Sequence, residues 1–380
     1  MGDVLRILHV VVNMNRGGAE TFIMNVYRNI DRSKIQFDFL TCREGVFDEE
    51  ITRLGGRIHR IPYVTDVGHF KYMKQLDLFF QNHNIYPIVH AHMDKMSGLV
   101  LRAAKKAEIP IRIAHSHNTK SEGNVIARLY KRFVGQYIYA NATEYVACST
   151  LAAKWLFKRR VTKILKNGIV PESFSYNQQI REQTRASLNI YDDTFVVGHV
   201  GRFAPQKNHV FILNIFSEFL KHKSNAILLL VGEGPLRQEL EQKAKQLKMS
   251  EKVIFTGVRS DVPELLQSMD ILFFPSIHEG LPVTLIEAQG AGLPCIISDT
   301  ISNEVDLGLN LIGFFSLENL EDWIERLIIL SEEKIIRTTN LETFVQQGYS
   351  IKETASDLKE YYLSLTGDVN ENTNHIHAYV

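Results

Sequence analysis

The sequence contains two successive series of short apolar segments, and in each series the segments alternate with helical patterns. Runs of this kind, closed by Gly, Pro or Ser before a helix begins, are typical of strands buried on both faces of a parallel sheet. The first series comprises 5–12, 37–40, 88–91, 111–114 and 145–148, and the second comprises 195–200, 226–231, 253–256, 271–274 and 295–298. We therefore predict an α/β protein with two Rossmann-like βαβ domains, for which 380 residues are enough.

The change from one series to the next sets the predicted domain boundaries. Residues 1–170 form the first domain and residues 195–350 the second, and the stretch 171–194, which contains Pro, Ser and Asn, is predicted to link them. A last helical pattern, 351–365, follows the second sheet and is expected to complete the first domain. The tail 367–380 is rich in Asn and His, so we expect it to be disordered.

Charge is distributed unevenly along the chain, although it sums to zero. Residues 1–170 carry 26 Lys and Arg against 14 Asp and Glu, and the remainder carries 17 against 29. The densest basic stretch, 154–166, interleaves its cations with Trp155, Leu156 and Phe157, which suits contact with an anionic membrane. A solvated basic helix face is the commoner explanation of such a stretch. No nucleic-acid partner is expected.

Cysteine usage and the first residues both favour a cytoplasmic location. The three cysteines, Cys42, Cys148 and Cys295, lie far apart, without the spacing of a zinc site or a redox pair. The first apolar run is interrupted by Arg6 and His9, and it is too short for a membrane span and lacks a signal-peptide pattern. We therefore expect a cytoplasmic protein, with any membrane association at the cytoplasmic face.

Two basic residues follow the first strand of the second series. The loop from Gly201 to Asn208 places Arg202 and Lys207 at the carboxyl end of that strand, where open α/β sheets bind ligands. A guanidinium can hold phosphate oxygens through two hydrogen bonds, and a lysine adds a point charge, so the pair suits a diphosphate. Taken alone, such residues in a loop are more often merely solvated.

Two carboxylates flank the start of a helix that follows the fourth strand of the second series. Glu279 lies in the loop, and Glu287 lies about 1.5 turns into the helix that Pro282 is expected to begin. Val283 and Thr284 would then offer unpaired amides to a phosphate. The two carboxylates can reach different ends of an extended ligand, such as a sugar and a ribose. The structural alternative is a cap for Glu279 and a surface ion pair for Glu287.

Glycine loops end the neighbouring strands. Gly232 and Gly257 follow the second and third strands of the second series, and Gly17 and Gly18 follow the first strand of the chain. Glycine lets a ligand approach the backbone closely. A purely structural turn is an equal alternative for Gly17 and Gly18, because they lack the spacing of the dinucleotide fingerprint.

His115 and His117 end a strand of the first series, and histidine suits proton transfer or hydrogen bonding to a sugar near neutral pH. We expect a spacing of two to direct one ring to each face of the sheet, which makes one of the two histidines structural. Metal binding by the pair is disfavoured, because no carboxylate or cysteine is spaced to complete a site. The chain also lacks an Asp-x-Asp pair, so no metal is expected, and the charge of a leaving diphosphate would fall to Arg202, Lys207 and helix amides.

Together these elements resemble the family 4 glycosyltransferases, a retaining group that uses nucleotide sugars and has the two-lobed GT-B fold. The resemblance covers most of the chain. The matching motifs, in order, are GGAE at 17–20, AHSHN at 114–118, NGI at 167–169, GRFAPQKN at 201–208, VGEGP at 231–235, FTGVRSDV at 255–262 and a Glu-x7-Glu element at 279–287. Within the family, the sequence is similar to bacterial enzymes that build exopolysaccharide or capsule repeat units.

The resemblance implies a role for each matching residue. Arg202 and Lys207 would bind the donor diphosphate, Glu287 would hold the ribose hydroxyls and Glu279 would contact the transferred sugar. The strand-end histidine of the family corresponds to His115 or His117, of which we prefer His117. The rest of the implied donor site comprises Gly17, Gly18, Gly201, Gly232, Gly257, Val258, Arg259, Gly280, Leu281, Val283 and Thr284.

The implied fold is GT-B, an α/β architecture with two Rossmann-like domains facing across a cleft. The implied activity is transfer of a hexosyl or N-acetylhexosaminyl unit from a nucleotide diphosphate sugar, with UDP the expected carrier, to a glycan or polyprenyl-diphosphate-linked acceptor. Retention of configuration and the absence of a metal or other cofactor are implied as well. Two alternatives would keep the donor contacts: a nucleotide-sugar epimerase and a catalytically silent scaffold subunit. A nicotinamide dehydrogenase is disfavoured, because the first glycine loop lacks the fingerprint.

Overall fold

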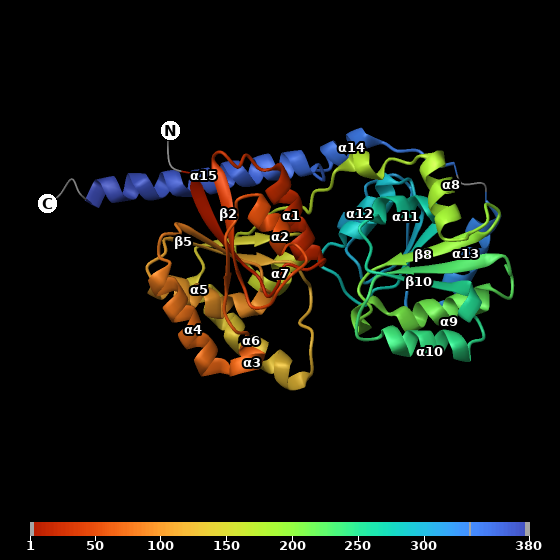
Figure 1. Ribbon diagram of the computed structural model, residues 1–380, viewed down its shortest axis with the longest axis horizontal. Coiled ribbons are helices and arrows are strands. Elements are labelled where there is room, and N and C mark those ends of the chain that lie inside the picture. The colour runs from red at the N-terminus through yellow and green to blue at the C-terminus, as the bar shows by residue number, and fades with distance from the viewer. Residues whose placement is uncertain (1–3, 334–335, 377–380) are drawn as a thin grey trace. The chain divides into compact units, whose positions relative to one another are not determined.

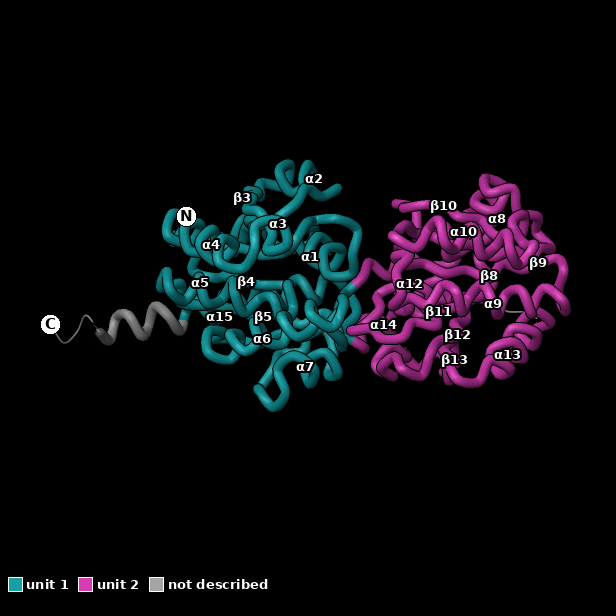
Figure 2. The backbone as a smooth tube through the Cα atoms, turned by 90° about the horizontal axis from the view of Figure 1, so that it is seen from below, with its two compact units in different colours: residues 1–168, 348–380 teal, residues 169–347 magenta. Residues whose placement is uncertain are grey.

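The computed structural model of the chain describes residues 4–333 and 336–376, with side chains through residue 367. The chain divides into two compact units, residues 1–168 with 348–380 and residues 169–347 (Figure 2). Each unit contains one parallel sheet with helices packed on its faces (Figure 1). The predicted α/β architecture is therefore confirmed for both halves of the chain.

The first unit is built on a seven-stranded parallel sheet in the order β3-β2-β1-β4-β5-β6-β7. Its strands are β1 (Leu5–Val10), β2 (Ile35–Thr41), β3 (Ile58–Arg60), β4 (Ile88–Ala91), β5 (Ile111–Ser116), β6 (Glu144–Ala147) and β7 (Lys163–Ile164). Its helices are α1 (Gly18–Asn29), α2 (Asp48–Arg53), α3 (Val64–Val67), α4 (His69–Asn82), α5 (Ser97–Lys106), α6 (Val125–Asn141), α7 (Thr150–Phe157) and α15 (Ile351–Ile376), with the 3-10 turn η1 (Asp94–Met96).

The second unit is built on a six-stranded parallel sheet in the order β10-β9-β8-β11-β12-β13. Its strands are β8 (Phe195–Val200), β9 (Ala226–Val231), β10 (Val253–Gly257), β11 (Ile271–Phe274), β12 (Cys295–Ser298) and β13 (Ile312–Phe315). Its helices are α8 (Gln178–Ser187), α9 (His209–Phe219), α10 (Arg237–Gln246), α11 (Val262–Ser268), α12 (Val283–Gly290), α13 (Leu320–Glu332) and α14 (Leu341–Gln346). The 3-10 turns are η2 (Pro171–Phe174), η3 (Pro205–Lys207), η4 (Ser250–Lys252) and η5 (Asn303–Val305). The central strands pack their apolar side chains against α9, α10 and α13 around the buried Trp323.

Each sheet reverses its strand order once, between β1 and β4 in the first unit and between β8 and β11 in the second. At such a point the connections leave in opposite directions, so a crevice opens outside the carboxyl ends of the two strands, where doubly wound sheets bind their ligands. The loops that follow β8 and β11 are the ones that carry Arg202, Lys207 and Glu279. The topology of the second unit therefore brings the predicted basic pair and the first carboxylate to one place.

All ten predicted strands are present, and three further strands were missed. The missed strands, β3, β7 and β13, lie at sheet edges, and their residues are largely half-buried or exposed. An edge strand faces solvent and needs no continuous apolar run, which is the signal on which the prediction depended.

Two segments differ from the predicted domain plan. Residues 171–194 belong to the second unit, because they contain α8, whose Arg181 and Arg185 both form ion pairs with Asp270. Helix α15 packs in the first unit and continues through Ile376, past the predicted end at 365. No proline interrupts residues 366–376, so the helical backbone can continue there. Residues 377–380 of the predicted tail lie outside the described residues.

Candidate active site

At the reversal point of the second sheet, the loop after β8 is tied to the loop after β11. Lys207 Nζ lies 2.7 Å from Glu279 Oε1, and only 16% and 10% of the two side chains are exposed. The side-chain amide of Gln206 donates a hydrogen bond to the backbone carbonyl of His278 (2.7 Å), and the backbone carbonyl of Gln206 accepts one from the backbone amide of Ile277 (2.8 Å). The structure thus brings together two predicted site residues that lie 72 positions apart.

Arg202 lies in the same loop and differs from Lys207 in its surroundings. Its side chain is exposed, and its guanidinium has no ion pair or hydrogen bond with any residue that the structure describes. Lys207, by contrast, is compensated by Glu279 and also lies over the ring of Phe274, with Nζ 4.6 Å from the ring centroid. Arg202 therefore offers a free positive charge to an anion at this edge of the sheet, and Lys207 is held in a fixed position.

Two of the predicted glycines are needed for the packing of these loops. A Cβ on Gly201 would lie 3.2 Å from Cε of Lys207, so glycine there leaves room for the lysine side chain. Gly232 has a φ of +143°, and a Cβ on it would lie 2.0 Å from the carbonyl oxygen of Gly201. Its amide donates to the carbonyl of Gly257 (2.9 Å). The glycine at 232 therefore has a structural reason in the chain itself. A Cβ on Gly257 would meet nothing within 4 Å, but the φ of +72° at this residue also favours glycine.

Helix α12 begins where it was predicted to, with Pro282 at its N-cap. Val283 and Thr284 lie in its first turn and are partly exposed, and amides of a first turn lack partners within the helix. Glu287 follows in the second turn, partly exposed and without a hydrogen-bond partner among the described residues, and desolvation raises the pKa of its carboxyl group to about 7. Gly280 and Leu281, just before the helix, are buried.

In the segment after β10, Arg259 has a partner close by in the chain, and the predicted role of this segment toward a ligand stays a prediction. The guanidinium of Arg259 forms two hydrogen bonds with the carboxylate of Asp261, two residues further on, at 2.8 and 2.5 Å. Its side chain is therefore engaged locally, which leaves the backbone and the exposed side chain of Val258 to border a ligand.

In the first unit, Gly17 is the N-cap of α1 and Gly18 is its first residue. Gly18 is exposed, and a Cβ there would meet nothing within 4 Å. The structure places both glycines at the carboxyl end of β1, as predicted, and their role toward a ligand stays a prediction.

A row of three histidines crosses the carboxyl ends of β1, β4 and β5 in the same unit. His9 Nδ1 lies 2.9 Å from His92 Nε2, and His92 Nδ1 lies 2.8 Å from His117 Nε2. The adjacent rings are inclined by only 20° and 29°, so each pair is joined edge to edge. His9 and His92 are buried, whereas His117 is partly exposed.

A second row lies against the first. The hydroxyl of Tyr362, on α15, lies 2.6 Å from His90 Nδ1, and His90 Nε2 lies 3.1 Å from His115 Nδ1. All three side chains are fully buried. We refer to the two rows, which comprise His9, His90, His92, His115, His117 and Tyr362, as the histidine ladder.

The ladder corrects our expectation for His115 and His117. We expected their rings to point to opposite faces of the sheet, but the rings stack with centroids 3.9 Å apart. Alternate residues of a strand share a face, so a spacing of two places both rings together. His115 is nonetheless inaccessible, and of the two only His117 has surface to offer to a ligand.

The number of hydrogens on the side chains of the second row determines which group donates in each of its hydrogen bonds. Tyr362 has His90 as its only side-chain hydrogen-bond partner within the described chain, so its hydroxyl donates to His90 Nδ1. The hydrogen of His90 then lies on Nε2 and is donated to His115 Nδ1, which leaves the hydrogen of His115 on Nε2. In the opposite direction the Tyr362 hydroxyl would accept from His90, and its own buried hydrogen would have no side-chain acceptor among the described residues.

The ladder is uncharged near neutral pH. Burial lowers the pKa of His9 and His117 to about 3 and that of His90, His92 and His115 well below the usual range. Neutral imidazoles can bind metals, and two trios, His9–His90–His92 and His92–His115–His117, have ligand atoms within 4.8 Å of one another. The nitrogen separations in the rows, 2.8 to 3.1 Å, are those of direct N–H···N bonds and fall short of the ~3.3 Å between ligands of a tetrahedral zinc ion. We interpret the ladder as a hydrogen-bonded array.

Four residues of the ladder were not among the predicted site residues. His90 and His92 repeat the His-x-His pattern of the next strand, so a signal for these two was present. His9 and Tyr362 carried none, because their place depends on strand register and on the return of α15 to the first unit.

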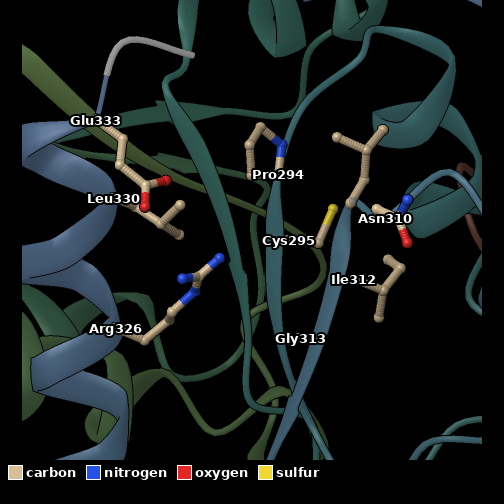
Figure 3. A pocket seen from close by; sticks show the side chains of 9 residues that line it. Pro294, Cys295, Asn310, Ile312, Gly313, Arg326, Leu330 and Glu333 are labelled. Carbon is tan, nitrogen blue, oxygen red and sulfur yellow. The ribbon is translucent and has the colours of Figure 1, made fainter.

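A pocket of about 250 Å³ lies in the second unit, at the amino-terminal ends of β12 and β13 (Figure 3). Pro294, Cys295, Ile312, Arg326 and Glu333 are among its lining residues. It therefore lies at the sheet edge opposite to the loops that carry Arg202 and Glu279, and none of the predicted site residues lines it.

Comparison with known proteins decides the family. Residues 17–164 match the family described as "Glycosyl transferase 4-like domain", and residues 180–342 match "Glycosyl transferases group 1". The chain is 38% identical to EpsF of Bacillus subtilis (strain 168), a protein assigned as a glycosyltransferase, over 94% of this chain and 96% of EpsF. The chain is a glycosyltransferase of the family 4 type.

Two further relatives have more specific names. The glycosyltransferase is 26% identical to the capsular polysaccharide biosynthesis glycosyltransferase CapH of Staphylococcus aureus, over 96% of this chain and all of CapH. It is 24% identical to the UDP-Gal:alpha-D-GlcNAc-diphosphoundecaprenol alpha-1,3-galactosyltransferase of Escherichia coli, over 74% of this chain and 76% of that enzyme.

Solved structures confirm the fold of the glycosyltransferase. HepE of Anabaena, whose crystal structure contains UDP and glucose, superposes with a TM-score of 0.73 at 17% identity, over 98% of this chain and all of HepE. The lipopolysaccharide biosynthesis glycosyltransferase WaaG superposes with a TM-score of 0.69 over 93% of this chain. The predicted GT-B fold is confirmed, and of the activities considered the family supports the glycosyltransferase over the epimerase and the silent subunit.

Proposed function

We propose that this glycosyltransferase moves a sugar from a nucleoside diphosphate sugar to a hydroxyl of a glycan or polyprenyl-diphosphate-linked acceptor, with retention of configuration. The observation that carries the proposal is the unpaired guanidinium of Arg202 at the reversal point of the second sheet, in the same loop as the fixed ammonium of Lys207. Cations at this edge of the sheet suit a diphosphate. The amides of Val283 and Thr284, at the start of α12, can donate further hydrogen bonds to a phosphate at the same edge.

Two carboxylates at this edge are proposed to make further contacts with the donor. Glu287 has no partner in the described chain, so its carboxylate is available to accept hydrogen bonds from a pair of ribose hydroxyls. Glu279, which Lys207 holds in a fixed position, would contact the transferred sugar. UDP is the proposed nucleotide, supported by the UDP that HepE binds and by the UDP-Gal in the name of the Escherichia coli relative.

In the proposed reaction, the bond between the anomeric carbon and the diphosphate oxygen breaks, and a bond forms from that carbon to the acceptor oxygen. The departing diphosphate takes up the hydroxyl proton on the same face of the sugar, so the configuration is retained and free nucleoside diphosphate is released. Arg202 and Lys207 would stabilise the charge that develops on the diphosphate. No metal is assigned to this step, and activity is expected to persist in the presence of a chelator.

The acceptor class and the pathway are inferred from the relatives. The Escherichia coli enzyme is named for a diphosphoundecaprenol acceptor and CapH for capsular polysaccharide biosynthesis, so we place this glycosyltransferase in the assembly of an exopolysaccharide or capsule. Such an acceptor would be reached at the cytoplasmic face of a membrane. No helix of the described residues is long and apolar enough to cross one.

Replacing Arg202 tests the proposal. The variant Arg202→Ala should slow the release of nucleoside diphosphate by about two orders of magnitude or more, because a charge partner of the transition state is lost. Mass spectrometry of the donor, with free nucleotide as the readout, measures the effect. Arg326→Ala, which removes an arginine at the opposite edge of the same sheet, serves as the control and should keep normal activity. Full activity in Arg202→Ala would remove the central assignment.

A further inference from the structure

Helix α6 presents an apolar stripe that nothing in the described chain covers. Val125, Ile126, Leu129 and Phe133 are each between 58% and 77% exposed. Their spacing places them on one side of the first turns of the helix, whereas Val134 and Ile138 lie buried against the rest of the unit. Four large apolar side chains on one short helix face are more than single exposed residues, and such patches mark contact surfaces.

The charged residues of α6 itself are all positive, although the exposed Glu122 lies just before the helix and its carbonyl accepts a hydrogen bond from Lys131 Nζ (3.0 Å). Arg128, Lys131 and Arg132 lie on α6, and residues 125–141 contain no Asp or Glu. None of the three cations forms a salt bridge with a described residue. A ligand that combined apolar and anionic groups would satisfy both parts of this surface.

The start of α4 extends the surface. His69 Nδ1 lies 2.8 Å from the hydroxyl of Tyr130, which holds the beginning of α4 against α6. The next two residues, Phe70 and Lys71, are both exposed, and Phe70 is among the most exposed large apolar residues of the unit. We call the residues Phe70, Lys71, Val125, Ile126, Arg128, Leu129, Arg132 and Phe133 the α6 surface.

The basic stretch 154–166, for which membrane contact and a solvated helix face were the two interpretations, differs from the α6 surface in its exposed side chains. Its apolar residues Leu156 and Phe157 are buried in the first unit. Its cations Lys158, Arg160, Lys163 and Lys166 lie over the rings of Tyr139, Tyr145, Tyr361 and Tyr349, at 4.7 to 6.0 Å from the centroids. This stretch can offer charge to a partner, and Val161 and Ile164 are its exposed large aliphatic side chains, which form no stripe comparable to that of α6.

We propose that the α6 surface docks on an anionic lipid bilayer. The stripe from Ile126 to Phe133 is about 10 Å long, and a face of this kind can enter the boundary between headgroups and acyl chains while the flanking cations meet lipid phosphates. A second copy of the chain is a poorer occupant, because it would place the same cations opposite one another. The inference rests on the proposed function, since a polyprenyl-diphosphate-linked acceptor is reached at a membrane surface.

Vesicle co-sedimentation of the full chain tests the proposal. We expect binding to vesicles of phosphatidylglycerol and phosphatidylcholine and much weaker binding to phosphatidylcholine alone. The double variant Arg128→Ala/Arg132→Ala should weaken binding about 25-fold, at about fivefold per cation. Leu129→Asp/Phe133→Asp should weaken it at least as much. The matched control Val46→Asp/Ile85→Asp changes two exposed apolar residues of the unit that lie outside both the α6 surface and the stretch 154–166, and it should bind as the parent does.

Two further measurements separate this proposal from others. Donor cleavage in vesicle-free solution should be unchanged in the α6 variants, so a loss of vesicle binding with normal cleavage concerns the surface and leaves the proposed function untouched. Thermal unfolding should also be unchanged, because the altered side chains are exposed. Equal binding to neutral and anionic vesicles, unaltered binding by both double variants, or a change in oligomeric state as their only effect would each overturn the proposal.

Discussion

At the scale of single residues, the two carboxylates of the candidate site are in opposite states. Glu279 is held by Lys207 at 2.7 Å and acts as a fixed, compensated charge. Glu287 has no such cation, and desolvation raises the pKa of its carboxyl group to about 7. A carboxyl group poised near neutrality can change its protonation when a ligand arrives, which makes Glu287 the residue whose role a pH experiment can isolate.

Donor binding should therefore weaken as the pH falls from 8 to 6. Hydroxyl donors favour the ionised carboxylate, so below a pKa of about 7 the donor must displace a proton from Glu287, and its dissociation constant should rise by up to about tenfold per pH unit. Calorimetric titration with a UDP-sugar at several pH values measures this dissociation constant.

Variants isolate the contribution of Glu287. Glu287→Gln should bind about 1.5–3 kcal/mol more weakly at pH 8 and lose most of the pH dependence, because a charged acceptor is replaced by a neutral one. The exposed Glu318 of the same unit supplies the control Glu318→Gln, which should retain the parent profile. An unchanged pH profile in Glu287→Gln would separate this carboxylate from the donor.

At the scale of elements, the histidine ladder joins three strands and a helix through neutral side chains. The carboxyl ends of β1, β4 and β5 contribute five imidazoles, and α15 contributes the hydroxyl of Tyr362. Because the rings are buried and uncharged, the ladder stabilises the first unit only while it remains unprotonated.

The protein should lose stability as the pH falls below about 6.5. In the folded chain the pKa of His9 and of His117 is lowered to about 3, whereas an unfolded histidine titrates near 6.5, so between these values the unfolded state binds more protons. Stability is then complete above pH 6.5 and falls toward lower pH, by up to about 1.4 kcal/mol per unit for each such histidine.

Chemical denaturation at pH 8, 6 and 5 measures the free energy of unfolding and so gives the slope of its dependence on pH. His9→Phe should reduce it, because one proton fewer is taken up on unfolding. The exposed His222 provides the control, and His222→Ala should leave the slope as it is. A free energy of unfolding that stays level between pH 8 and 5 would contradict the neutral ladder.

At the scale of the whole molecule, the chain repeats one topology in two units, and each sheet reverses its strand order between its first and fourth strands. The interior strands and the place of Arg202, Lys207 and Glu279 could be predicted, because continuous apolar runs and the carboxyl ends of strands are local properties of a sequence. The edge strands β3, β7 and β13 could not, since their exposed residues interrupt that pattern.

Contacts between residues far apart in the sequence could not be predicted either. His90 and Tyr362 are 272 residues apart, and His9 meets His92 only because β1 pairs with β4. The pairing of Arg259 with Asp261 is local, but sequence cannot tell a salt bridge from a free guanidinium at that spacing.

Hydrogen–deuterium exchange of the full chain with and without UDP tests the central claim, that the donor binds at the reversal point of the second sheet. The account predicts that UDP protects residues 201–208 and the start of α12, and that Arg202→Ala removes this protection at the same UDP concentration. Protection confined to the loops of the first unit, or to the pocket lined by Pro294 and Ile312, would contradict it.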